Sequence, residues 1–215
     1  TSLLATSRSF VFKEELKQEE SWNYGVFLTR DFTILGSKYA LNLDFFRTDF
    51  INQVIVDLDQ NSNLVYLYNL DGESYSNSFQ SELTFSPLER FDVLLAYRIN
   101  DVKASYDGEI RQVPLVKTSK GLLNLAYATN YQKWKFDFTL QYNGTSRLPN
   151  KSLGQSENAE GKTPDFAIIN AQVTRKFKHF EIYAGGANLT GFTQEDPILA
   201  SNEPYGDDFD ASQVW

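Results

Sequence analysis

Ten residues decide the fold class of this chain: Lys133-Trp134-Lys135-Phe136-Asp137-Phe138-Thr139-Leu140-Gln141-Tyr142. Every even-numbered position in this stretch is apolar or aromatic, and every odd-numbered position is polar. Because the side chains of a β-strand point alternately to its two faces, a period of two predicts a strand with one apolar and one polar face.

Similar alternation recurs along the chain, less cleanly where Ser81 falls on the apolar side of its stretch. The sequence thus predicts eight strands and no amphipathic helix. The stretch that begins at Tyr39 reads on through Arg47 and Asp49 to Val56, which predicts a strand of about 20 residues. The further stretches are 22–29, 39–45, 78–85, 91–99, 123–127, 169–174 and 180–184.

The links between these strands alternate between short and long. A meander whose links are short at one end of the sheet and long at the other is typical of outer-membrane β-barrels. We therefore predict an all-β fold, an antiparallel up-and-down meander of about eight strands that forms part of a transmembrane β-barrel, each strand pairing with its sequence neighbours. The short links are 33–37, 87–90, 130–132 and 178–179, and the long ones are 59–74, 105–118, 146–164 and 191–215.

The two faces of such a sheet meet different solvents. We expect the even-numbered set from Trp134 to Tyr142 to face lipid, and the set with Lys135 and Asp137 to face a wet lumen. Trp22, Tyr24, Trp134 and Tyr142 lie near strand ends, where amphipathic rings form interfacial girdles. A soluble β-sandwich shows the same alternation, so the pattern by itself leaves both folds open.

Composition excludes several function classes. The 215 residues carry 20 Lys and Arg against 28 Asp and Glu, a net charge of −8, which makes nucleic acid an unsuitable partner. Cysteine is absent and His179 is the only histidine, so the sequence offers no catalytic constellation and no cysteine- or histidine-based metal site. We expect neither an enzyme nor a cofactor. No apolar run approaches the length of a transmembrane helix.

The candidate ligand-binding residues are those on predicted loops, where binding residues gather. Two are the loop aromatics Tyr66 and Tyr68. Three more come from the acidic run Asp207, Asp208 and Asp210, which lacks the spacing of an EF-hand and is typical of a solvated acidic loop. These five residues are the predicted ligand contacts.

Several short motifs recur in an order and spacing that are hard to obtain by chance. They are Glu19-Glu20-Ser21-Trp22-Asn23-Tyr24-Gly25, Phe46-Arg47-Thr48-Asp49-Phe50 with Asn52-Gln53-Val54, Tyr75-Ser76-Asn77-Ser78-Phe79-Gln80, Asn188-Leu189-Thr190, and Pro197-Ile198 followed by Phe209-Asp210-Ala211-Ser212 and Val214-Trp215. Together they resemble the C-terminal half of the barrel in the TonB-dependent outer-membrane receptors. The similarity covers nearly the whole chain and rests on structural motifs rather than on ligand sites.

The resemblance implies a 22-stranded barrel with an N-terminal plug in the cell outer membrane, energised through a TonB-contacting segment. Its implied partners are outer-membrane lipid, the plug domain, TonB and a small-molecule nutrient such as an iron chelate, cobalamin or a glycan. The chain begins at Thr1 and contains no Met. We therefore expect residues 1–215 to be a single partial β-barrel domain, a fragment that lacks the plug and the final strand.

Two other functions remain open at this point. One is a soluble, secreted β-sandwich that binds carbohydrate through Tyr66 and Tyr68. The other is a passive, porin-like channel.

Overall fold

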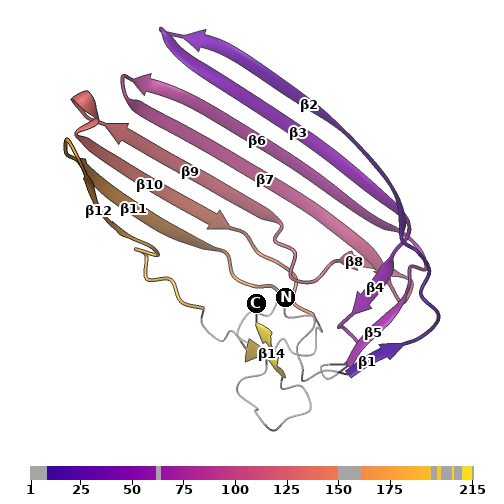
Figure 1. Ribbon diagram of the computed structural model, residues 1–215. Coiled ribbons are helices and arrows are strands. Elements are labelled where there is room, and N and C mark those ends of the chain that lie inside the picture. The colour runs from indigo at the N-terminus through magenta and orange to yellow at the C-terminus, as the bar shows by residue number, and fades with distance from the viewer. Residues whose placement is uncertain are drawn as a thin grey trace.

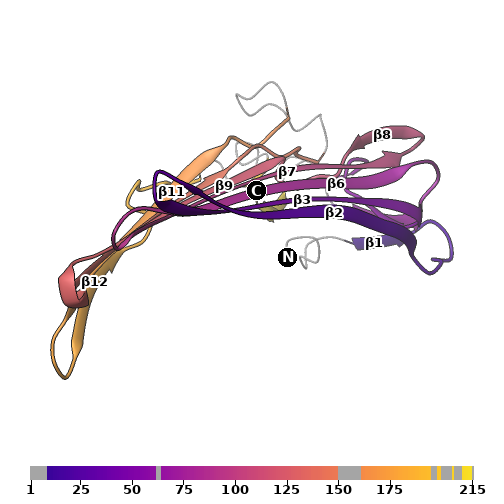
Figure 2. The same ribbon diagram turned by 90° about the horizontal axis from the view of Figure 1, so that it is seen from above.

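A computed structural model describes residues 9–61, 64–149, 161–194, 198–199, 205 and 210–214, the backbone alone for 198–199 and 210–214. Its dominant feature is one broad sheet of long strands that lie side by side (Figure 1). Seen from above, the sheet is a single curved layer (Figure 2).

The main sheet runs in the order β12-β11-β10-β9-β7-β6-β3-β2, and β8 adds to the end of β7. All of these pairings are antiparallel. The strands are β2 (Glu20–Ile34), β3 (Ser37–Asn52), β6 (Ser74–Leu88), β7 (Phe91–Tyr106), β8 (Glu109–Gln112), β9 (Ser119–Ala128), β10 (Trp134–Asn143), β11 (Phe166–Lys176) and β12 (Glu181–Gly186).

The predicted meander is confirmed: the eight strands found by alternation pair with their neighbours in the chain. Tight turns join them at one end of the sheet. Leu35 and Gly36, between β2 and β3, have φ angles of 50° and 84°, the two positive values that a type I′ hairpin requires. A short 3₁₀ turn, Asn130–Gln132, joins β9 to β10.

The register aligns like faces across the whole sheet. Leu41, Leu83, Leu95, Leu123 and Leu140 pair in one row across five strands, so the apolar side chains share one face. Polar positions such as Asn42, Glu82, Asn124 and Thr139 share the opposite face, whereas Arg30 lies on the apolar face beside Leu41.

Hydrogen bonds across the strands stabilise that polar face. The Asn124 amide donates to the Thr139 hydroxyl at 2.9 Å, and the Asn42 amide donates to Glu82 at 3.4 Å. This is the division between lipid and lumen that the period of two predicts.

Aromatic rings on the apolar face form a belt near the tight turns. Tyr39 stacks between Phe32 and Phe85, with ring centroids 5.3 and 5.0 Å away. The belt continues through Phe91, Tyr127, Phe136 and Trp134.

Two of the predicted strand-end aromatics lie toward the opposite end of the sheet. Tyr24 donates to Asp49 at 2.7 Å, and Tyr142 donates to Asp165 at 3.0 Å. The apolar band therefore ends in hydrogen-bonding rings there, as interfacial aromatics do.

The prediction that the strand from Tyr39 runs to Val56 is wrong. β3 ends at Asn52, and β4 (Val54–Asp57) belongs to a second sheet, of order β1-β5-β4. The apolar run continues past the break because Ile55, 2% exposed, is buried in a separate small core. Periodicity cannot distinguish that second core from a continued strand.

The long links also contain strands that alternation missed. β5 (Leu64–Asn69) lies within 59–74 and β8 within 105–118, while β1 (Ser9–Phe12) pairs in parallel with β5. Near the C-terminus β13 (Ile198–Leu199) pairs with β14 (Asp210–Val214).

The β-sandwich alternative does not fit this arrangement. Within the described ranges the small sheet meets the main one through β4 and β7 at the long-loop end, and the apolar face stays uncovered, with Phe136 42% exposed. No helix among the described residues is long and apolar enough to cross a membrane.

Phe138→Lys tests the assignment of the apolar face to lipid. Phe138 lies in the middle of β10 between Leu125 and Ala171. A lysine at mid-bilayer on a lipid-facing strand costs about 2–4 kcal/mol, so the full-length protein should lose most of its folded surface population. Heat-modifiable migration and surface labelling measure this. Gln141→Lys, an exposed position on the polar face of the same strand, is the control; equal loss in both variants would contradict the assignment.

Candidate functional site

The long connections converge at one end of the main sheet, where β1, β4, β5 and β8 lie together (Figure 1). A small core of Ile55, Tyr68, Ala104 and Tyr106 joins β4 and β5 to the end of β7, and β1 and β8 are attached by pairing with β5 and β7. Ala104 and Tyr106 belong to the end of β7, so the loop structure is anchored on a strand of the barrel sheet. This part of the chain is a packed unit, which we call the loop unit: β1, β4, β5, β8 and the end of β7.

A buried carboxylate organises the centre of the loop unit. Asp57, 1% exposed, accepts hydrogen bonds from the Asp59 backbone N–H at 2.8 Å and from the Gln60 amide at 2.6 Å. The Tyr68 hydroxyl donates to the same carboxylate at 3.1 Å. Burial and the nearby Asp57 charge raise the pKa of Tyr68, so this hydroxyl stays protonated and remains a donor.

An ion pair joins segments far apart in the sequence. Arg147 Nη1 lies 2.9 Å from both carboxylate oxygens of Asp59, 88 residues away. The Arg147 Nε donates to the Gln112 carbonyl, and its guanidinium lies 5.6 Å from the Tyr106 ring. Both charged side chains are largely buried, 13% and 9% exposed, so the pair acts as a clip between three loops.

The segments on either side of the undescribed residues 150–160 are fixed to each other. Thr163 donates its backbone N–H to the Ser146 carbonyl at 2.8 Å, and its hydroxyl accepts from the Ser146 backbone N–H at 3.0 Å. Lys117 donates to the same hydroxyl at 3.0 Å, and burial lowers the pKa of Lys117.

A lysine stacked on two tyrosines is a partly exposed feature of the loop unit. Lys13 Nζ lies 5.0 Å from the Tyr66 ring centroid and 4.8 Å from that of Tyr68. It is 36% exposed and lies 3.9 Å from Asp107, itself 59% exposed. A cation beside aromatic rings suits an anionic, planar ligand.

The structure therefore brings two of the five predicted site residues together. Tyr66 is half-buried beside Lys13, whereas Tyr68 is buried and its hydroxyl is committed to Asp57. Asp207 and Asp208 lie outside the described residues, and Asp210 begins β14, where only its backbone is described.

Sequence reasoning missed Lys13, Asp59 and Arg147, since each matters through partners distant in sequence and no local pattern marks them. Among the described residues, no group of three His, Cys, Asp or Glu side chains gathers as a metal site would need.

Arg147→Met tests the clip. It leaves the Asp59 carboxylate buried, with the nearest other cation, Arg111, 3.7 Å away. Removing one member of a buried pair costs about 3–5 kcal/mol. Residues 54–69 and 105–113 should therefore exchange backbone hydrogens much faster, while β9–β11 stay protected. Arg90→Met breaks an exposed pair with Glu89 at the opposite end and should leave the loops unchanged. Unaltered loop exchange in Arg147→Met would show that the clip is dispensable.

Tyr106 makes the loop unit sensitive to alkali. Burial raises the pKa of Tyr106 to about 12, against about 10 in an unfolded chain. Because the pKa of Tyr106 is higher in the folded state, the protonated hydroxyl stabilises the fold. This contribution to the free energy of unfolding is complete below pH ~10 and is lost as the pH rises toward ~12. Tyrosinate absorbance of full-length protein should show a late-titrating group that Tyr106→Phe removes. The same late titration in both proteins would assign it to another tyrosine.

Comparison with known proteins places this arrangement in a family. Residues 4–189 match the model of the β-barrel of TonB-dependent receptor-like proteins. A search of curated proteins gives no match.

Among solved structures the chain is similar to three iron-chelate receptors. For the ferric enterobactin receptor of Pseudomonas aeruginosa the TM-score is 0.58 at 17% identity, over 81% of this chain and 26% of the receptor. For the ferric-catecholate import receptor Fiu of E. coli the TM-score is 0.55 at 15% identity, over 86% of this chain and 24% of the receptor. For the ferric preacinetobactin receptor of Acinetobacter baumannii the TM-score is 0.52 at 16% identity, over 81% of this chain and 25% of the receptor.

This chain thus spans about a quarter of the length of each receptor, and at these identities the likeness shows the fold alone. The family model covers most of the chain, and its members are transporters of the outer membrane, not enzymes. The chain belongs to the TonB-dependent receptor β-barrel family.

Proposed function

We propose that this segment is part of a receptor that imports a scarce nutrient across the outer membrane, with an iron chelate as the favoured class. The observation that carries the proposal is the family match over residues 4–189, supported by the similarity of the sheet to the barrels of a ferric enterobactin receptor, a ferric preacinetobactin receptor and a ferric-catecholate import receptor. Residues 1–215 are in this view one partial barrel domain. The plug and the TonB-contacting segment would lie elsewhere in the protein, and TonB, outer-membrane lipid and the nutrient would be its partners.

Ligand capture is proposed for the loop end. Tyr66 and Lys13 there present an aromatic ring and a cation to solvent, a combination that suits an anionic chelate with planar aromatic groups. Tyr68 would act by positioning, because its ring supports Lys13 and its hydroxyl holds Asp57. Asp207, Asp208 and Asp210 remain proposed ligand contacts near the C-terminus.

The experiment compares Tyr66→Ala with wild type in the full-length receptor, measuring surface abundance and uptake of radiolabelled ferric enterobactin. Losing one aromatic contact of a bound ligand costs about 1–1.5 kcal/mol, so uptake per receptor should fall about tenfold. Tyr131→Ala is the matched control. Tyr131 is an exposed tyrosine with Lys133 5.9 Å from its ring, but it lies in a tight turn at the opposite end of the sheet.

The acidic group is tested in the same assay by changing Asp207, Asp208 and Asp210 together to Asn. Uptake per receptor should fall while abundance stays constant, because loop side chains contribute little to barrel assembly. Variants that lose abundance yet keep uptake per receptor would refute this division between loop and barrel. If the wild-type receptor imports cobalamin or maltodextrin but not ferric enterobactin, the proposal that it is an importer is supported and the proposal that its ligand is an iron chelate is wrong.

A further inference from the structure

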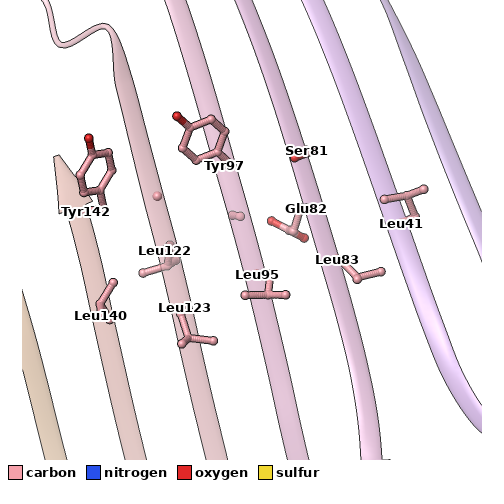
Figure 3. A pocket seen from close by; sticks show the side chains of 12 residues that line it. Leu41, Ser81, Glu82, Leu83, Leu95, Tyr97, Leu122, Leu123, Leu140 and Tyr142 are labelled. Atoms are coloured by element: carbon pink, nitrogen blue, oxygen red, sulfur yellow. The ribbon is translucent and has the colours of Figure 1, made fainter. Parts of the chain in front are cut away.

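Two cations lie side by side on the polar face of the main sheet, on the side of the loop unit. Arg98 on β7 and Lys120 on β9 are directly opposite each other in the register, and both are exposed. Tyr97, the residue before Arg98, lines a shallow hollow on the apolar face with Leu95 (Figure 3). Because successive side chains of a strand point to opposite faces, Arg98 and its partner Lys120 face the lumen.

A third cation, Lys117, lies beside this pair. Its Nζ is 5.2 Å from the centroid of the Phe166 ring. Phe166 belongs to the same row across the sheet, because it pairs with Asn143, which is the other cross-strand partner of Lys120. Burial lowers the pKa of Lys117, and the charge of Lys120 lowers it further, so the two ammonium groups are within electrostatic reach. We call Arg98, Lys117 and Lys120 the basic cluster.

The pairing of Arg98 with Lys120 is unfavourable in the absence of an anion. Directly opposite residues of antiparallel strands have Cβ atoms about 5 Å apart, and like charges in such positions repel. Within the part of the chain that the structure describes, neither residue forms an ion pair. The Gln80 side-chain oxygen accepts from the Arg98 Nε at 2.8 Å and also from its Nη2. This neutral partner orients the guanidinium and leaves its charge uncompensated, in a chain whose net charge is −8.

Two carboxylates lie near the basic cluster on the polar face, but neither stands between it and the loops. Asp44 lies in the same row, two strands away from Arg98. Glu82 is on the strand next to Arg98, one row nearer the tight turns. The next row toward the loops contains Ser78 and Asn100, which hydrogen-bond to each other at 3.2 Å. An anion that enters from the loop end therefore meets neutral side chains and then the cations.

The side chains of the cluster restrict the ligand to one chemical class. Ammonium and guanidinium groups only donate hydrogen bonds, and the planar fork of an arginine matches the paired oxygens of a carboxylate or phosphate. Cations that face one space together suit a ligand with more than one negative charge. A neutral ligand would leave the repulsion between Arg98 and Lys120 in place.

We propose that the basic cluster is an anion site on the inner wall of the barrel, which binds the carboxylate, phosphate or catecholate oxygens of a nutrient that carries several negative charges. The inference rests on the proposed importer function and deepens it, because it adds a second site to the one at Lys13 and Tyr66. A nutrient captured at the loop end passes to the basic cluster next.

The test measures how fast acetic anhydride modifies individual lysines of the full-length receptor, with mass spectrometry as the readout. The probes are the anionic chelates ferric enterobactin and ferric citrate, the neutral compounds ferrichrome and cobalamin, and inorganic phosphate, all at equal ionic strength. At about ten times its Kd, an anionic chelate should slow acetylation of Lys120 about tenfold, since the amine reacts only in the unoccupied receptor. Lys133, exposed beside the tight turn at the opposite end, should react at an unchanged rate.

Several results would overturn the site. They are protection of Lys120 by neither anionic chelate, protection by a neutral compound, and protection by phosphate alone, which means an adventitious ion only. A Lys120 that is unreactive before any probe is added also overturns it, because another segment of the receptor then covers the cluster. Uptake is measured separately. Import of ferrichrome or cobalamin upholds the importer and refutes the site, whereas protection of Lys120 without uptake upholds the site and refutes the importer.

Arg98→Gln and Lys120→Gln test the two cations one at a time. Each variant should bind the protecting chelate about tenfold more weakly, as expected for the loss of one charge-assisted hydrogen bond. Each should keep its folded barrel, because removing one of two like charges relieves repulsion. Equilibrium dialysis with radiolabelled iron measures the binding.

Lys135→Gln is the matched control. Lys135 also faces the lumen, but it lies at the tight-turn end of β10, 4.0 Å from Glu181. This variant should bind the chelate as the wild-type receptor does. Equal weakening in all three variants would reflect the total charge of the barrel and overturn the site, and so would unchanged binding in both Arg98→Gln and Lys120→Gln.

Discussion

Backbone hydrogen bonding in hydrocarbon is the constraint on which the rest of this structure depends. A lipid-exposed strand has no water to satisfy its N–H and C=O groups, so each strand must pair along its whole length in the membrane. The long, regular ladders from β2 to β11 meet that requirement. Pairing in turn fixes the register, and a slip of one residue would turn Lys135 and Asp137 toward lipid. The alternating sequence therefore favours a single register, and that register keeps the apolar side chains on the lipid-facing side.

Beyond the hydrocarbon the same chain follows different rules. Strands there are short, and β1 and β5 run in parallel. Charged groups are enclosed there: the buried Asp57 accepts three hydrogen bonds, and Asp59 pairs with Arg147. Water lets irregular backbone satisfy its polar groups, so this end can vary in shape without endangering the sheet. The side chains suited to binding a ligand accordingly lie at the end of the sheet that is outside the hydrocarbon.

The sequence was most informative where one physical rule acts on every residue. Alternation located all eight strands of the meander, and the tight turns located its short-loop end. It failed at Val54–Asp57, because an apolar run looks the same whether it extends a membrane strand or enters a second core. It missed Lys13 and Arg147 altogether, since their partners lie tens of residues away. Tyr66 and Tyr68 were expected on a loop, whereas both lie on strand β5, Tyr66 half-buried and Tyr68 buried.

The clip between Asp59 and Arg147 joins residues 88 positions apart, whereas each hairpin of the sheet joins near neighbours. Closing so long a loop is entropically expensive and slow compared with zipping a hairpin. The main sheet removes most of that cost, because β6, β7, β9 and β10 lie between the two residues in sequence and their pairing already brings both residues to one end. The clip is accordingly a contact that forms late in folding, after the sheet, so its loss should change the rate of unfolding more than the rate of sheet formation.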